Sequence, residues 1–210
     1  MTLAVEQWPQ VEVPTGLTEE QFVAWCPDDV RAEYRDGEVI VMSPANTQHG
    51  RIQRFLAALL TVYLDGKGSG FALGPEDTVR LRPGLLRVPD LAFVRATRRR
   101  RIRRTHIAGA PDAVFEIVSP GSRARDWRDK HHDYQAAGVP EYWLIDPQVE
   151  EAHLYRLNAR GEYEDIAEDD GRLVSEAIAG FWLRPAWLFG DPLPKVLDCL
   201  AEIEARGANS

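Results

Sequence analysis

The chain has 210 residues, of which 44% are hydrophobic and 28% charged, so it can bury a core and is not a disordered tail. No run of about eighteen apolar residues occurs, and the first ten residues lack the pattern of a secretory signal, so we expect no membrane association. Cys26 and Cys199 lie far apart in the chain and form no metal-type pair. A zinc module and a disulfide scaffold are thereby excluded, and a reducing, cytoplasmic location is expected.

The net charge of -8 conceals one strongly basic segment. Residues 95–104 contain seven arginines and no acidic residue. An acidic body with one basic segment is unsuited to wrapping nucleic acid over its whole surface, but the segment could make a single electropositive contact. A solvated loop between two strands is an equally good interpretation.

The first predicted elements are a helix, a hairpin and a longer helix. Thr18 precedes an acidic first turn and Pro27 follows the apolar positions, which predicts a short capped helix. Asp36-Gly37 separates two short extended runs and is a strong hairpin signal. From Asn46 to about Asp65, apolar residues recur every three and four positions, as in an amphipathic helix of about five turns.

The middle of the chain is predicted to be extended, with β-rich runs at residues 76–84, 86–94 and 112–120. A helix at 124–138, a buried strand at 141–147, a meander at 150–185 and a last helix at 195–206 follow.

Strands combined with two helices predict a mixed sheet with helical cover, of the α/β (α+β) class. We expect residues 1–210 to form one domain, with a core at about 15–150 and the C-terminal β-meander extending the sheet. The absence of a glycine-rich phosphate-binding loop disfavours the nucleotide-binding folds.

Two acidic residues interrupt apolar strands. Asp90 lies within RVPDLAFV and Glu116 within DAVFEIVSP. A carboxylate in a buried strand is costly unless it is paired or binds a metal. Because consecutive strands are usually neighbours, both side chains can point to one side of the sheet, where two hard oxygen ligands suit Mg²⁺ or Mn²⁺. For Asp90, a carboxylate that caps a strand end is the alternative.

The following helix carries a candidate lysine. Asp126, Lys130 and Tyr134 are spaced four residues apart and therefore lie on one helix face. A lysine beside two metal-bound carboxylates can steer or deprotonate the attacking water and offset charge on the phosphate. An ordinary surface pair between Asp126 and Lys130 is the alternative interpretation.

Several motifs occur in an order that resembles the Uma2 family, the DUF820 group of restriction endonuclease-like proteins, over roughly residues 15–190. They are EYRDGE (33–38), MSP (42–44) with His49, VPD (88–90), GAPD (109–112), EIVSP (116–120), the spacing Asp126-x3-Lys130-x3-Tyr134, and GVPEYWLIDP (138–147).

The resemblance implies a PD-(D/E)xK nuclease fold, a central mixed sheet with helices on both sides. Asp90 and Glu116 match its two acidic motifs. The chain departs from the superfamily pattern at Val118, where a lysine is expected, and Lys130 matches the place on the next helix to which this family moves that lysine.

The resemblance also suggests secondary candidates. His49 starts the first long helix, where the superfamily often carries a glutamate that faces the metal; a histidine bonded locally is an equally good interpretation. Glu33 or Glu38 could supply an outer carboxylate, although an exposed hairpin charge is favoured. His131 and His132 adjoin Lys130 and are interpreted as surface residues.

The leading functional prediction is divalent-metal-dependent hydrolysis of DNA phosphodiesters. Asp90 and Glu116 would hold the metal, with Lys130 acting on the water. The residues predicted to grip the DNA backbone are Arg98, Arg99, Arg100, Arg101, Arg103 and Arg104.

Two other classes of function are alternatives. One is a catalytically silent nuclease-fold module that binds DNA or protein. The other is a glycoside hydrolase that uses Asp90 and Glu116 as acid and base, without metal or lysine.

A homodimer is predicted from the apolar segment GFWLRPAWLF, residues 180–189, which we expect to expose more aromatic surface than a monomer shows. Trp143, Trp182 and Trp187 are interpreted as core or dimer contacts rather than platforms for base stacking.

Overall fold

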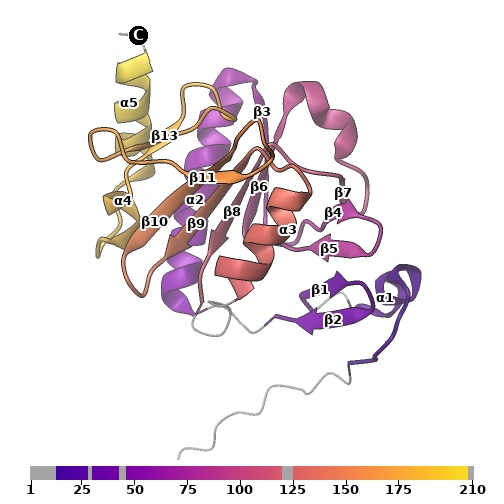
Figure 1. Ribbon diagram of the computed structural model, residues 1–210. Coiled ribbons are helices and arrows are strands. Elements are labelled where there is room, and N and C mark those ends of the chain that lie inside the picture. Colours follow the sequence, from indigo (N-terminus) through magenta and orange to yellow (C-terminus); the bar gives the residue numbers. More distant parts are fainter. Residues whose placement is uncertain (1–12, 28–29, 43–45, 120–124, 208–210) are drawn as a thin grey trace, which may run out of the picture.

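The computed structural model describes residues 13–27, 30–42, 46–119 and 125–207. A central sheet has helix α2 on one face and α3 on the other, and a smaller sheet with helix α1 lies beside one end (Figure 1). The predicted fold class, α/β with mixed sheets flanked by helices, is confirmed.

The larger sheet has six strands in the order β11-β10-β9-β8-β6-β3, and only β8 and β9 are parallel among these neighbours in the described chain. Parallel neighbours need a crossover, and the segment that carries Lys130 supplies it. In chain order the strands are β3 (Gly70–Leu73), β6 (Leu91–Arg95), β8 (Ala113–Ile117), β9 (Glu141–Asp146), β10 (Glu151–Leu157) and β11 (Tyr163–Asp165).

The smaller sheet has the order β2-β1-β5-β4-β7. Its strands are β1 (Ala32–Arg35), β2 (Glu38–Val41), β4 (Val79–Arg82), β5 (Leu85–Arg87) and β7 (Ile107–Ala108). The hairpin predicted at Asp36-Gly37 is confirmed, with φ values of 47° and 98° at these two residues.

The extended run at 86–94 is divided between the two sheets. Strand β5 ends at Arg87 and β6 begins at Leu91. Pro89 lies between them and has no N–H to donate to a ladder, which suits a junction. Asp90 therefore lies where the chain passes from one sheet to the other.

The helical segments are α1 (Glu19–Trp25), α2 (Thr47–Lys67), a 3₁₀ segment (Ala96–Arg101), a π segment (Arg125–Lys130), α3 (His131–Ala136), α4 (Ala186–Phe189) and α5 (Val196–Gly207). The Asn46 side chain caps α2 by accepting from the backbone N–H of His49 at 2.8 Å, and Gly68 ends the helix in the left-handed conformation, with φ 60°. His49 is thereby fixed in the first turn of α2.

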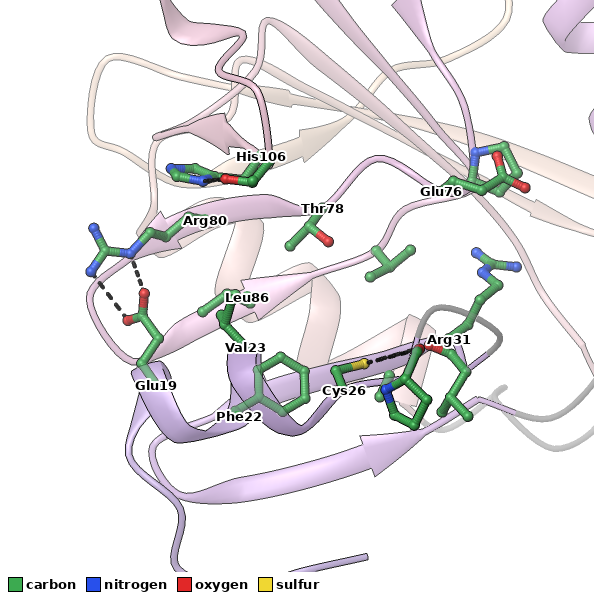
Figure 2. A pocket seen from close by; sticks show the side chains of 16 residues that line it. Glu19, Phe22, Val23, Cys26, Arg31, Glu76, Thr78, Arg80, Leu86 and His106 are labelled. Carbon is green, nitrogen blue, oxygen red and sulfur yellow. Dashed lines mark hydrogen bonds and ion pairs between the residues drawn. The ribbon is translucent and has the colours of Figure 1, made fainter. Parts of the chain in front are cut away.

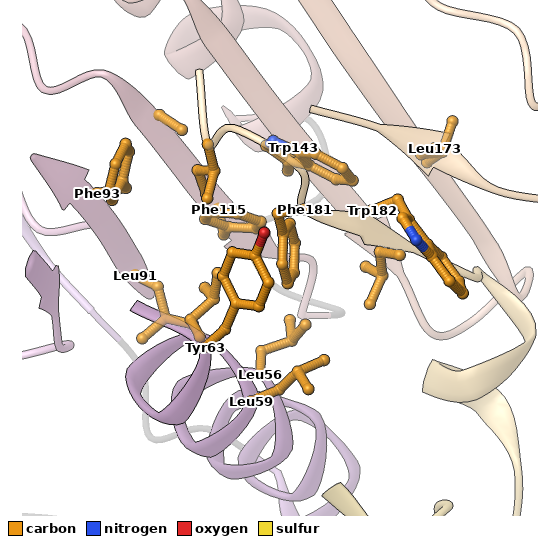
Figure 3. Packing of buried hydrophobic residues seen from close by; sticks show 14 of the residues in the cluster. Leu56, Leu59, Tyr63, Leu91, Phe93, Phe115, Trp143, Leu173, Phe181 and Trp182 are labelled. Atoms are coloured by element: carbon orange, nitrogen blue, oxygen red, sulfur yellow. The ribbon is translucent and has the colours of Figure 1, made fainter. Parts of the chain in front are cut away.

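The main core lies between α2 and the larger sheet (Figure 3). Alternate residues of β8 serve its two faces: Phe115 and Ile117 pack with α2, whereas Val114 packs on the α3 side. The indole of Trp143 stacks on the ring of Phe115 at a centroid distance of 5.2 Å. Trp143 is fully buried, which confirms its assignment to the core.

The exposed aromatic surface predicted for residues 180–189 is absent from the structure, in which these residues are all described. Phe181, Trp182 and Leu183 are buried against the main core (Figure 3), and Trp187 packs on Trp182 at 5.1 Å between ring centroids. The segment forms strand β13 (Trp182–Leu183) and helix α4, and β13 pairs with β12 (Leu173–Val174). Its aromatic rings are covered within the chain, so a homodimer stays a prediction without this support.

Helix α1 covers the smaller sheet through Phe22, whose ring stacks on that of Tyr34 at 5.2 Å. The cap predicted at Thr18 is present, and it takes the form of a capping box with Gln21 as its second member. Between α1 and strands β4 and β5 a pocket remains open (Figure 2).

Gly70 is required by the close approach of β3 to β6. A methyl group there would lie 2.5 Å from the carbonyl oxygen of Val94 and against the ring of Phe93. Gly70→Ala should lower the free energy of unfolding by about 1–3 kcal/mol in thermal or urea denaturation. The control Gly66→Ala meets nothing within 4 Å on α2 and should raise stability by about 0.5–1 kcal/mol. Equal effects would contradict the packing of β3.

No helix in the described ranges is long and apolar enough to cross a membrane.

Candidate active site

The two predicted acidic residues lie level with each other at one end of the central sheet. The register pairs Leu91 with Phe115, so the next step along both strands brings Asp90 level with Glu116. The backbone N–H of Ile117 donates to Asp90 Oδ2 at 2.8 Å, which ties the two strand ends together. Asp90 is 3% and Glu116 1% exposed.

Helix α2 holds the other oxygen of Asp90. His49 Nε2 lies 2.9 Å and Gln53 Nε2 2.8 Å from Asp90 Oδ1. The two side chains are four residues apart and so share one face of the helix. The ring of His49 thus contacts the site and is not bonded only within its own helix turn.

Glu116 is held by the helical segment on the opposite face of the sheet. Lys130 Nζ donates to Glu116 Oε2 at 2.8 Å, and the Tyr134 hydroxyl donates to Oε1 at 2.7 Å. Lys130 is 1% exposed, so its interpretation as part of a surface pair is wrong. The side chain of Asp126, the third residue of the predicted face, lies outside the described part of the chain.

Glu33 is buried, so the interpretation of this residue as an exposed hairpin charge is wrong. Its side chain is completely buried. Its Oε1 atom lies 3.3 Å from Lys130 Nζ and accepts a hydrogen bond from the Val88 N–H at 3.2 Å. Arg87 donates to the other oxygen, Oε2, at 2.6 Å. Burial alone would raise the pKa of Glu33, but the charges of Lys130 and Arg87 outweigh it and hold that pKa below its usual value. Glu38, beyond the hairpin turn, is exposed as expected.

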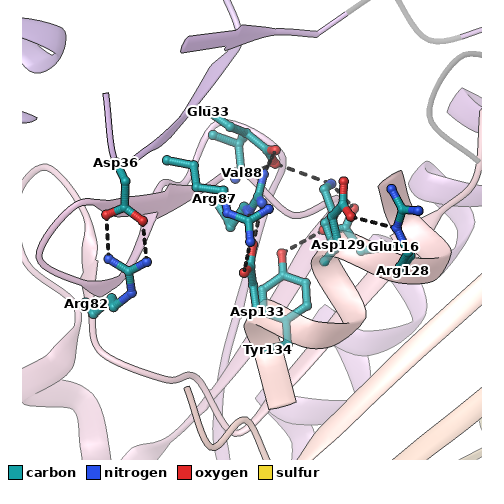
Figure 4. Close-up of polar contacts among 12 residues, drawn as sticks. Glu33, Asp36, Arg82, Arg87, Val88, Glu116, Arg128, Asp129, Asp133 and Tyr134 are labelled. Atoms are coloured by element: carbon teal, nitrogen blue, oxygen red, sulfur yellow. Dashed lines mark hydrogen bonds and ion pairs between the residues drawn. The ribbon is translucent and has the colours of Figure 1, made fainter. Parts of the chain in front are cut away.

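Acids and bases alternate in this buried network (Figure 4). Glu116 contacts Lys130, Lys130 contacts Glu33, and Glu33 contacts Arg87, whose guanidinium also binds Asp133 on α3. Removing one member of such a network leaves a buried charge without its partner, which costs about 3–5 kcal/mol. Through Glu33 the smaller sheet therefore contacts Lys130, and through Arg87 it contacts helix α3.

Comparison with known proteins decides the family. Residues 19–186 match the family model Uma2, described as "Putative restriction endonuclease". The chain belongs to the Uma2 family. A crystal structure from Anabaena variabilis, of a "putative nuclease belonging to DUF820", superposes with a TM-score of 0.69 at 22% identity and covers 82% of this chain and 97% of its own. No curated protein matches the chain.

Restriction endonuclease-like proteins usually use divalent metal ions, and the carboxylates of the candidate site are oxygen ligands of the kind that such an ion prefers. Among the described residues no group of three His, Cys, Asp or Glu side chains is placed to hold a metal. Mg²⁺ is commonly held by only one or two carboxylates, with waters and substrate phosphates as its other ligands. Asp90 and Glu116, level on neighbouring strands, are the candidate carboxylates for such a site.

The arginine segment lies away from this site. It follows the far end of β6, about 16 Å from Asp90 at the usual rise of a strand. Arg98 pairs with the buried Asp112 at 3.0 Å, and the Arg95 N–H donates to the same carboxylate at 2.9 Å. Part of the basic charge is therefore neutralised within the protein, and contact of this segment with DNA stays a prediction.

The two histidines beside Lys130 differ. His132 is exposed, as expected. His131 is half-buried, with its ring 4.8 Å from Tyr155 and 5.1 Å from Tyr163 between centroids. Burial, with the neighbouring His132, lowers the pKa of His131. His131 is thus a packing residue on the α3 side of the sheet.

Four residues that contact the candidate site or its network were not predicted from the sequence: Gln53, Arg87, Asp133 and Arg31. The Nη2 atom of Arg31 lies 4.0 Å from Asp90 Oδ1. Two of them had a signal. Gln53 follows His49 by one helical turn, and Arg87 is a charged residue within an apolar run. Nothing local distinguished the other two.

Tyr134 gives a pH-dependent prediction. Burial, together with the charges of Glu116 and Glu33, raises the pKa of Tyr134 well above 10. The folded protein therefore keeps this proton at pH values where the unfolded chain loses it, and the stabilisation present below about pH 10 declines above it. Tyr134→Phe should cost about 1.5–3 kcal/mol at pH 7, less at pH values above 10. Urea denaturation of both proteins at pH 7 and above pH 10 checks this. The same difference in the free energy of unfolding at the two pH values would contradict it.

Proposed function

We propose that this protein hydrolyses phosphodiester bonds of DNA with the help of Mg²⁺ or Mn²⁺. The observation that carries the proposal is a pair of buried carboxylates level on neighbouring strands, one of them bonded to a buried lysine. Membership of a family described as restriction endonuclease-like supports a nuclease. The metal dependence and the DNA substrate belong to the proposal.

Asp90 and Glu116 would hold the metal. When bound, such an ion polarises the phosphate and lowers the pKa of a bound water. Asp90 is oriented for this role by Ile117 N–H, His49 and Gln53, which occupy both of its oxygens from fixed backbone and helix positions. His49 and Glu33 are positioning residues in this scheme, since one contacts Asp90 and the other is paired with Lys130 and Arg87.

Lys130 would act on the water and on the phosphate. Its ammonium lies between Glu116 and Glu33, which fixes it beside the proposed metal ligand. A buried ammonium in this place can orient the attacking water and stabilise the charge that develops on the phosphate oxygens. A glycoside hydrolase, the other enzyme class considered, would need neither this lysine nor a metal ion.

The experiment is cleavage of circular DNA, which has no ends. Supercoiled plasmid and single-stranded circular DNA are incubated with wild-type protein and Mg²⁺ or Mn²⁺, with EDTA as the control. We expect cutting that depends on the metal. Cutting that persists in EDTA would overturn the metal, and no cutting of either substrate would favour a silent binding module. A homodimer and a cytoplasmic location stay predictions from the sequence.

A further inference from the structure

The pocket beneath helix α1 is a cavity of about 490 Å³ between that helix and strands β4 and β5 (Figure 2). Its apolar lining includes Phe22, Leu86 and Val88, and Thr78 and Glu76 add polar groups. This volume lies within the usual range of small-molecule sites, about 300–1,000 Å³, which combine an apolar lining with a few polar groups. The pocket can therefore hold a small ligand with an apolar body and polar edges.

One end of the pocket adjoins the proposed metal site. Val88, in the lining, is separated from Asp90 only by Pro89. Arg31, also in the lining, has its Nη2 4.0 Å from Asp90 Oδ1. A ligand in the pocket would consequently be next to a phosphate bound at Asp90 and Glu116.

Two hydrogen-bond donor atoms of Arg31 are not used within the described part of the chain. Its side chain is 34% exposed, and its buried Nε and Nη2 have no hydrogen-bond partner in the described ranges of the chain. A buried donor without a partner is costly, and the planar guanidinium group matches a phosphate with two parallel donors. The unused donors of Arg31 therefore favour an anionic group of a ligand.

The other end of the pocket leads toward positive charge. Figure 2 shows His106 and Arg80 at the end opposite Arg31, with Glu19 beside Arg80 as its ion-pair partner. His106 and Thr105 line the pocket there, and the preceding Arg103 and Arg104 are exposed. Arg80 is paired with Glu19, so the positive charge near this end comes from Arg103 and Arg104, and Arg31 supplies it at the other end. An apolar pocket with basic side chains near both ends suits a nucleotide unit, which has an apolar base between charged phosphates.

We propose that this pocket binds the nucleoside next to the cleaved phosphate of single-stranded or locally unpaired DNA, and that Arg31 binds the adjoining phosphate. A base stacked and paired in a duplex cannot enter a pocket beneath a helix, whereas an unpaired base can. Thr78 and Glu76 offer acceptors to the N–H groups of a base edge. The inference rests on the proposed function, since it assigns a substrate class to the same site.

Binding of DNA without cleavage tests the inference. Fluorescence anisotropy of a labelled oligothymidylate in EDTA is measured over a series of salt concentrations, with a duplex of equal length for comparison. Arg31→Gln removes the phosphate contact, and Thr78→Phe fills the pocket without touching the Thr78 carbonyl that accepts from Ile107 N–H. Arg160→Gln, in the turn before β11, removes an exposed charge elsewhere and is the matched control.

We expect wild type to bind the single strand more tightly than the duplex. Arg31→Gln should weaken binding and reduce the slope of log K against log[salt] by about 0.7, the value for one phosphate contact of a single strand. Thr78→Phe should weaken binding about tenfold with an unchanged slope, because it removes contacts with a base. Arg160→Gln should match wild type.

Tight duplex binding, an unchanged affinity in either pocket variant, or no binding by wild type would overturn the inference. The result is separable from the proposed function because EDTA prevents metal-dependent cutting. If the protein cuts DNA but all variants bind it equally, the proposed nuclease function stands and the inference about the pocket fails. If the protein never cuts DNA but both pocket variants bind it more weakly, the inference about the pocket stands and the proposed nuclease function fails.

Discussion

Lys130→Met should lower the rate of DNA cleavage by about 10²–10⁴-fold, the range for a positioned group that acts on a reacting proton or charge. The substitution removes the ammonium that lies between Glu116 and Glu33 and keeps most of the side-chain volume. Single-turnover cleavage at saturating Mn²⁺ is the measurement. Lys67→Met, at the exposed C-terminal turn of α2, is the control and should cut like wild type.

Loss of Lys130 also leaves two buried acids without their shared partner, so the single variant should be less stable as well as slower. The double variant Lys130→Met/Glu33→Gln removes one of those acids with the lysine and should recover stability. If the lysine acts in the reaction, cleavage stays low in the double variant. Recovery of cleavage together with stability would assign Lys130 a purely structural role.

Arg87→Met should lower the free energy of unfolding by about 3–5 kcal/mol. The guanidinium of Arg87 is completely buried and binds both Glu33 and Asp133, which would be left charged inside the protein. Arg82→Met is the matched control. Arg82 also binds an aspartate, Asp36, at 2.6 Å, but the two side chains are 49% and 57% exposed. Its removal should cost at most about 1 kcal/mol.

Urea denaturation of the two arginine variants compares a buried and an exposed ion pair in one protein. Because Arg87 joins the smaller sheet to α3, Arg87→Met should also weaken the hold of Glu33 on Lys130 and reduce cleavage. Similar losses of stability in both variants would contradict the network, since they would show that burial does not set the strength of these pairs.

Much of the fold could be predicted because its signals are local. The three- and four-residue apolar period defined α2, Asp-Gly defined the hairpin, and apolar runs interrupted by Asp90 and Glu116 marked the two strand ends that meet in the sheet. The helical spacing of Lys130 and Tyr134 was sufficient to place both on one face, and both indeed bond to Glu116.

The errors arose where a distant segment decides the environment. Glu33 follows the ordinary pattern of a polar hairpin, and only the packing of β1 against β5 and α3 buries it. The aromatic residues of 180–189 are covered by α2 and β9, which precede them by many residues in the chain. The arginine segment lies between two acidic strands in sequence, but the length of β6 carries it to the opposite end of the sheet.

Metal binding and DNA cleavage should both depend on Asp90 and Glu116. Mn²⁺ binding, followed by electron paramagnetic resonance, and plasmid cleavage are measured on the same samples of wild type, Asp90→Asn and Glu116→Gln. Asp65→Asn, on the exposed side of α2, is the control. We expect both site variants to lose tight Mn²⁺ binding and cleavage together, while the control keeps both. Site variants that bind Mn²⁺ and cut the plasmid as wild type does would contradict it.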